Sequence, residues 1–242
     1  MKIILLGTAY PYRGGLAAFN ERLAQQFQKE GHEVEVVTFT LQYPGFLFPG
    51  KTQYSTTPDH SGLPITRAVN SVNPLSWGKV GKDVARRHPD MVIFAYWMSF
   101  MAPCMGSIAR SIHRHCKAKV LALVHNMMPH EPSVLDRICP PYFVKSMDGF
   151  VALSQSVVDD IQKLDKAQKP KAWNPHPIYD HYGQLLSKQE ARQLLGLEPE
   201  TNYVLFFGFI RAYKGLDLLL EAFADERLRS QDVKLLVAGE FY

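Results

Sequence analysis

The chain has 242 residues, of which 46% are hydrophobic and 21% charged, with a net charge of +4 and a pI near 8.9. A chain of this length suits one large domain or two small ones and can bury a substantial core. It contains no long basic run and no nucleic-acid recognition motif, so nucleic acid is excluded as a partner. Its three cysteines (Cys104, Cys116 and Cys139) are too few and too scattered for a disulfide framework or a zinc site, which indicates a reducing compartment.

Short apolar runs alternate along the chain with segments whose apolar residues recur at helical spacing. We predict strands at residues 2–6, 34–39, 91–96, 120–124 and 150–153. Helices are predicted at residues 16–27 (closed by Gly31), at residues 98–110, and after a start at Ser156. This alternation predicts an α/β fold, with a Rossmann-like parallel sheet covered by helices on both faces.

Two adjacent glycines, Gly14 and Gly15, lie between the first predicted strand and the first predicted helix. Because they lack side chains, the backbone at the helix start can approach an anionic ligand closely. The dinucleotide fingerprint Gly-x-Gly-x-x-Gly and the P-loop ending Gly-Lys-Ser/Thr are both missing at this junction. A nicotinamide-dependent oxidoreductase and a P-loop enzyme are therefore disfavoured.

The segment 43–64 is rich in Pro, Gly, Ser and Thr and carries three consecutive apolar residues, Phe46, Leu47 and Phe48. A loop of this length is usually functional or mobile, so it could shape an acceptor site or touch a lipid surface. The alternative, an extra hairpin packed on its own domain, stays open.

The stretch from Met91 to Ala109 has no charged residue and must be weighed as a membrane span. A spanning helix needs about 20 apolar residues, and Pro103 and Gly106 interrupt this shorter stretch. We therefore interpret it as a buried strand followed by a helix.

The predicted strand at 120–124 is followed by His125 and Asn126, at the carboxyl end where open α/β sheets bind their ligands. Glu131, in the next loop, is a weaker candidate. For His125 the alternative is a histidine whose hydrogen bonds are satisfied within the wall of a cleft.

The segment 173–179 contains two prolines and reads as an extended connection, so we predict a domain boundary near Ile178, with domains 1–178 and 179–242. Beyond it, Ser187 and Glu190 have the spacing of a capping box, and Gly196 is the matching helix stop.

An apolar strand at 203–207 ends at Gly208, and a helical pattern begins at Leu216. Arg211 and Lys214 lie in the loop between them. A strand, a basic loop and a helix start together form an anion site, because the helix dipole, the backbone N–H groups and the fixed cations all favour negative charge. A diphosphate fits these requirements.

The same segment has the form Phe-Gly-x5-Lys-Gly-x-Asp-x-Leu-x-x-Ala, which resembles the opening of the second domain in the "glycosyltransferase group 1" family. That resemblance implies the GT-B architecture, in which two Rossmann-like domains face a cleft, and a retaining, nucleotide-sugar-dependent transferase. It implies that Lys214 grips the donor diphosphate. The family's arginine usually follows the glycine directly, where this chain has Phe209, so Arg211 is the nearest equivalent.

The resemblance also assigns roles in the first domain. Gly14 and Gly15 would lie against the donor phosphate and sugar, and His125 would line the cleft beside the reacting sugar. No metal and no cofactor are expected, and the acceptor would be a saccharide or a lipid-linked sugar in polysaccharide or glycolipid synthesis. A cytoplasmic location is expected, with peripheral contact at the inner face of the membrane allowed.

The family's Glu-x7-Glu motif lies further into the second domain than this chain reaches, so we expect a fragment that is inactive alone. Two alternatives remain. One is a sugar-nucleotide epimerase of the same architecture, which would form an epimer without an acceptor. The other is a non-catalytic binding or assembly partner, if the chain naturally ends at Tyr242.

Overall fold

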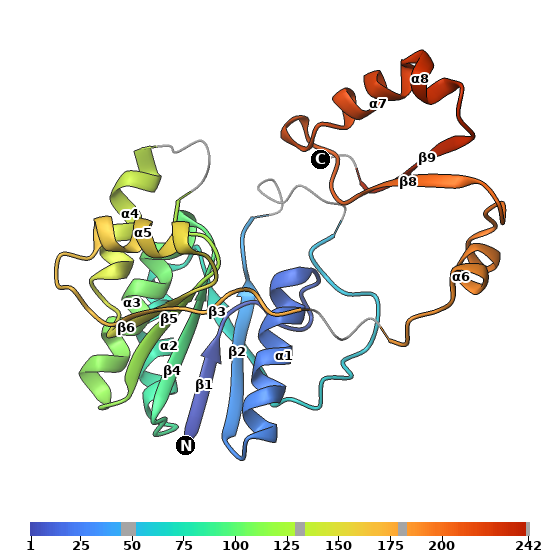
Figure 1. Ribbon diagram of the computed structural model, residues 1–242. Helices are drawn as coiled ribbons and strands as arrows, with labels where there is room; N and C mark the ends of the chain where they lie inside the picture. Colours follow the sequence, from blue (N-terminus) through green and yellow to red (C-terminus); the bar gives the residue numbers. More distant parts are fainter. Residues whose placement is uncertain (45–51, 129–133, 179–182, 241–242) are drawn as a thin grey trace. The chain divides into compact units, whose positions relative to one another are not determined.

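A computed structural model describes residues 1–44, 52–128, 134–178 and 183–240 (Figure 1). The chain divides into two compact units between Pro177 and Ile178. We call the residues up to Pro177 the first unit and those from Ile178 the second unit.

The first unit is built on a parallel sheet in the order β3-β2-β1-β4-β5-β6-β7. Its strands are β1 (Lys2–Leu6), β2 (Glu33–Leu41), β3 (Ile65–Asn70), β4 (Met91–Tyr96), β5 (Lys119–Val124), β6 (Gly149–Ala152) and β7 (Lys171–Trp173). The helices between them are α1 (Gly15–Lys29), α2 (Pro74–Ala85), the short 3₁₀ helix η2 (Ser99–Met101), α3 (Ala102–His115), α4 (Val134–Val144) and α5 (Gln155–Leu164).

Helices cover both faces of this sheet, as β1 illustrates. Ile4 and Leu6 belong to a large buried cluster with residues of α2, α3, α4 and α5, whereas Leu5 belongs to a smaller cluster with α1. Successive side chains of a strand point to opposite faces, so an unbroken apolar strand needs cover on both. The predicted α/β fold is confirmed.

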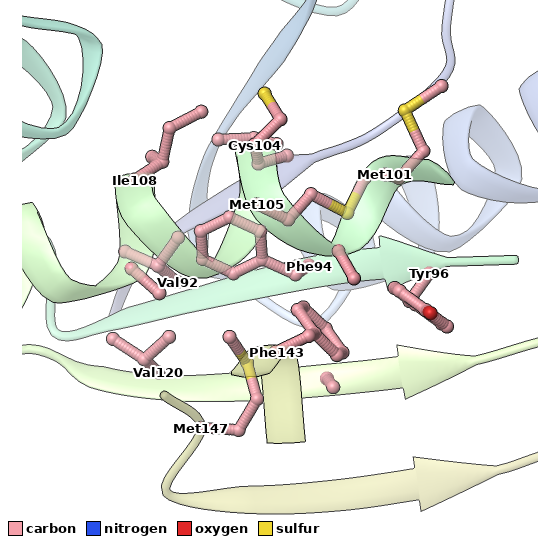
Figure 2. Close-up of a cluster of buried hydrophobic side chains, with 14 of the residues drawn as sticks. Val92, Phe94, Tyr96, Met101, Cys104, Met105, Ile108, Val120, Phe143 and Met147 are labelled. Atoms are coloured by element: carbon pink, nitrogen blue, oxygen red, sulfur yellow. The ribbon is translucent and has the colours of Figure 1, made fainter. Parts of the chain in front are cut away.

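The larger cluster is centred on β4, β5 and α3 (Figure 2). Tyr96, at the end of β4, stacks on Phe143 of α4 with ring centroids 4.3 Å apart. The uncharged stretch from Met91 is thus the buried strand β4, followed by η2 and α3, as expected. No helix in the described part of the chain is long and apolar enough to cross a membrane.

The second unit contains α6 (Lys188–Leu195), the parallel strand pair β8 (Asn202–Phe207) and β9 (Val233–Ala238), and three short helical pieces. These pieces are η3 (Ala212–Lys214), α7 (Leu216–Ala224) and α8 (Glu226–Arg229). The predicted capping box is confirmed, since Ser187 Oγ accepts from the Glu190 N–H and Glu190 accepts from the Ser187 N–H. Gly196 ends α6 in the left-handed conformation, as predicted.

The structure corrects the start of α5. The helix begins at Gln155, and Ser154, not Ser156, is its N-cap, because the Ser154 hydroxyl accepts from the Val157 N–H. Ser156 lies already within the first turn.

The segment 43–64 is described only in part, and Phe46, Leu47 and Phe48 lie outside the described residues. Tyr54 forms an antiparallel bridge with Tyr12 in the loop after β1. The Arg13 N–H donates to the Gln53 carbonyl at 2.9 Å, and the Ser55 N–H donates to the Pro11 carbonyl at 2.7 Å. Residues 52–55 therefore pair with the loop after β1.

Candidate active site

The strand order places a topological switch point between β1 and β4. From β1 the chain moves through α1 to β2 and then to β3, and α2 carries it back to β4 on the other side of β1. In open α/β sheets the ligand crevice opens at such a point, beyond the carboxyl ends of the strands. The residues that follow β1 and those that follow β5, the neighbour of β4, lie at this edge.

Gly14 is the N-cap of α1 and has φ +108°, a conformation that residues with side chains rarely adopt. The helix start has no side-chain cap and no acidic residue in its first turn. Its first N–H groups therefore meet no capping side chain, and the positive end of the helix dipole adds to them. Gly14 and Gly15 are both exposed, so this helix start is open to an anionic ligand.

Two polar side chains, one buried and one partly buried, hold the loop that leads to Gly14. The Ala9 N–H donates to Thr38 Oγ1 at 3.1 Å, and the Tyr10 N–H donates to Glu21 Oε1 at 2.7 Å. Burial raises the pKa of the Glu21 carboxyl, and the hydrogen bond from Tyr10 opposes that rise. The loop is thus anchored to both β2 and α1.

His125 follows β5, and its backbone N–H donates to the Tyr96 carbonyl at 2.8 Å. Its Nε2 atom is buried and has no hydrogen-bond partner among the described residues. Burial, together with a smaller contribution from the nearby His176, lowers the pKa of His125 to about 4. At neutral pH the imidazole is therefore uncharged, with one ring nitrogen still unpartnered.

Phe19 connects His125 to α1. Its ring meets the His125 ring edge-on, with centroids 4.9 Å apart, and lies 5.1 Å from the ring of His176. Neither Phe19 nor His176 stands out in the sequence, since Phe19 reads as an ordinary residue of the apolar helix face. Only the fold reveals that the helix that starts at Gly15 also contacts His125.

Of the two weaker candidates, Asn126 is exposed next to His125, and Glu131 lies outside the described residues. No group of three or more His, Cys, Asp or Glu side chains in the described ranges could hold a metal ion. The absence of a metal from the reaction stays a prediction.

In the second unit, the predicted diphosphate loop follows β8. The Gly208 N–H donates to the Ala238 carbonyl, and a Cβ atom at Gly239 would overlap the Gly208 carbonyl, so the ends of β8 and β9 approach closely. Arg211 and Lys214 both lie near Tyr213, with the Arg211 Cζ 5.9 Å and the Lys214 Nζ 5.4 Å from its ring centroid. Lys214 is exposed, and Gly215 caps α7 in the left-handed conformation.

In the first unit, the helix that starts at Gly14 and Gly15 thus contacts His125 through Phe19. The structure brings Arg211 and Lys214 together in one loop of the second unit. Residues 13–174 match the sequence profile described as Glycosyltransferase Family 4. The chain belongs to this family.

A relative with a related name and two solved structures with a similar fold accompany this match. The D-inositol 3-phosphate glycosyltransferase of Actinosynnema mirum is 27% identical over 93% of this chain and 58% of its own length. Anabaena HepE, solved in complex with UDP and glucose, has a TM-score of 0.68 at 16% identity over 100% of this chain and 62% of that one. The catalytic domain of Arabidopsis thaliana starch synthase IV, bound to ADP and acarbose, has a TM-score of 0.60 at 14% identity over 99% of this chain and 68% of that one.

The family profile confirms the group 1 glycosyltransferase resemblance, and the two solved structures confirm the GT-B type of fold. This glycosyltransferase family 4 chain spans 58% of the length of its relative from A. mirum.

Proposed function

We propose that this glycosyltransferase family 4 protein transfers a sugar from a nucleoside diphosphate to an acceptor hydroxyl with retention of anomeric configuration. The observation that carries the proposal is the open start of α1 at Gly14–Gly15, joined through Phe19 to a neutral His125 whose Nε2 is unpartnered. A transferase needs both features at one sheet edge: donors for a leaving phosphate and a neutral hydrogen-bonding group beside a sugar.

During transfer, negative charge builds on the leaving diphosphate while the sugar becomes oxocarbenium-like. Lys214, Arg211 and the Gly14–Gly15 backbone would stabilise that charge without a metal. Preorganised donors of this type are each worth about 2.7–4 kcal/mol. The exposure of Lys214 supports this role, because a bound diphosphate can reach it.

His125 would form a hydrogen bond to a hydroxyl of the sugar or of the acceptor. With its pKa lowered to about 4, the imidazole adds no positive charge beside a developing oxocarbenium ion at neutral pH. A protonated histidine there would oppose the reaction electrostatically. The depressed pKa therefore suits the proposed role.

The names of the relative and the neighbours suggest the first substrates to test. D-inositol 3-phosphate is one acceptor, and UDP and ADP are the two nucleotides seen in the neighbours. Saccharide and lipid-linked acceptors follow, in line with a proposed role in polysaccharide or glycolipid synthesis.

The test is a donor and acceptor screen with the protein expressed from its complete gene, with and without EDTA. The proposal expects acceptor-dependent release of nucleoside diphosphate, unaffected by EDTA, and a product whose anomeric proton shows the donor's configuration by NMR. An epimer formed without any acceptor would instead favour an epimerase. No turnover with any nucleotide sugar would favour a non-catalytic partner, and an inverted product would refute retention.

A further inference from the structure

Asn20 lies on α1 beneath the loop that follows β1, and its side chain is fully buried. Its Nδ2 atom donates to the Thr8 carbonyl at 2.8 Å. Its Oδ1 atom is buried and has no hydrogen-bond partner among the described residues. This amide therefore makes one contact to the loop and leaves its other end unsatisfied.

An asparagine is unexpected at this position. Its helix neighbours Ala17 and Ala24 are buried and apolar, so an apolar side chain would continue this face without the unpaired Oδ1. A buried polar atom without a partner lowers stability, and such atoms call for an explanation other than packing. Buried polar atoms without a hydrogen-bond partner are expected mainly at functional sites.

The loop is fitted closely to this amide. A Cβ atom at Gly7 would lie 2.9 Å from Asn20 Nδ2 and 2.7 Å from the Ala95 Cβ, so only glycine permits the approach. The hydrogen bond from Asn20 to Thr8 fastens α1 to the beginning of the very loop that ends at Gly14 and Gly15. Shifting Thr8 would thus shift the helix start at the other end of the loop.

We infer that Asn20 is a positioning residue, which fixes the loop from Gly7 to Gly14 through the Thr8 carbonyl. The loop then presents the N–H groups of the α1 start in one arrangement to the anionic part of the donor. The catalytic consequence rests on the proposed function, whereas the fixing of the loop does not.

The test compares Asn20→Leu with the wild-type protein by amide hydrogen exchange, thermal unfolding and steady-state transfer. Exchange is measured at the Ala9 and Tyr10 amides, which are hydrogen-bonded to Thr38 and Glu21. We expect these amides to exchange about five- to tenfold faster, since one buried hydrogen bond restrains the loop. The melting temperature should change little, because the variant removes the unpaired Asn20 oxygen but also takes the donor from the buried Thr8 carbonyl.

Sugar transfer should fall by more than any change in stability explains. In Asn20→Leu, kcat/KM for the donor should fall about tenfold, mostly in kcat, because misplaced donors stabilise the transition state less well. Gln28→Leu is the matched control, since it makes the same amide-to-apolar change at an exposed position of α1. Asn20→Ala is the second variant, for use if leucine proves too large to be accommodated.

The outcomes distinguish the fixing of the loop by Asn20 from its effect on sugar transfer. Unchanged exchange at Ala9 and Tyr10 in both Asn20 variants overturns the inference. Faster exchange with normal kcat/KM overturns its catalytic consequence. Faster exchange in a protein whose wild type transfers no sugar supports the positioning of the loop and overturns the proposed function instead.

Discussion

The two units both contain regular helices and strands, but they differ greatly in how many side chains are buried. In the first unit, strands β1 and β4 are almost entirely buried and helices cover both faces of the sheet. In the second unit, Thr201 is the one side chain buried among the described residues, and Phe207 is 82% exposed at the end of β8. Yet both units contain parallel strands, capped helices and left-handed glycines.

This difference separates local from long-range stabilisation. The capping box at Ser187 and the stop at Gly196 need only residues a few positions away, so α6 forms them without a core. Most helix stability in folded proteins, however, comes from packing of an apolar face. For a protein of these 242 residues, we therefore expect the first unit to unfold cooperatively and the described part of the second unit to contribute little to that transition.

The largest expected effect comes from the same substitution made in both units. Phe94→Ala removes a fully buried ring and should lower the free energy of unfolding by about 3–5 kcal/mol. Phe207→Ala removes an exposed ring and should change it by no more than about 0.5 kcal/mol. Urea unfolding followed by circular dichroism measures both, and equal losses would contradict the contrast between the units.

The pH dependence of the free energy of unfolding tests whether the His125 imidazole is shielded from water. The pKa of His125 is lowered to about 4 from an ordinary value of 6.5, so between these pH values the unfolded chain binds a proton that the folded chain does not. Stability should therefore fall as the pH drops from 6.5 to 4. The loss reaches roughly 2–4 kcal/mol, at about 1.36 kcal/mol per pKa unit.

His125→Gln removes this titration and leaves the other histidines in place. The wild-type protein should lose stability relative to the variant across that pH window, whereas the two should differ by a constant amount above pH 7. Parallel curves of unfolding free energy against pH would show that His125 titrates normally and is not buried as the structure has it.

Much of the first unit could be predicted from the sequence because its central strands are continuous apolar runs. The edge strand β3 was not predicted, since only Val69 of its residues is buried and half of its residues are polar. Helix α2 was missed too. It contains Gly81, where a Cβ atom would lie 2.5 Å from the Ser111 Cβ of α3. There glycine serves close helix packing, which a single sequence cannot distinguish from a turn.

The candidate site was predictable only where it depends on topology. His125 follows from the rule that ligands bind at the carboxyl ends of parallel strands, and Gly14–Gly15 follows from its place after β1. The contact of Phe19 with His125 and the hydrogen bond of Asn20 to Thr8 depend on how α1 lies on the sheet. The roles of these residues in transfer stay predictions.

Lys214→Ala tests whether the basic loop of the second unit contributes to sugar transfer. If Lys214 stabilises the leaving diphosphate, the variant should lose on the order of 100-fold in kcat/KM, or about 2.7 kcal/mol, with little change in stability because the side chain is exposed. Lys188→Ala, at an exposed position of α6, is the control. Near-normal turnover of the Lys214 variant would remove Lys214 from the donor site.

The smallest expected effect comes from removing a serine N-cap, which occurs in both units and so allows a direct comparison between them. Ser154 caps α5 and Ser187 caps α6, and replacing either by alanine should weaken its helix by about 1 kcal/mol. In Ser154→Ala the loss should appear in the global unfolding of the first unit, because Val157 and Ile161 join α5 to its core. In Ser187→Ala it should appear only as faster amide exchange within α6, where no side chain is buried. A lower global stability in Ser187→Ala would mean that α6 is coupled to a cooperative core after all.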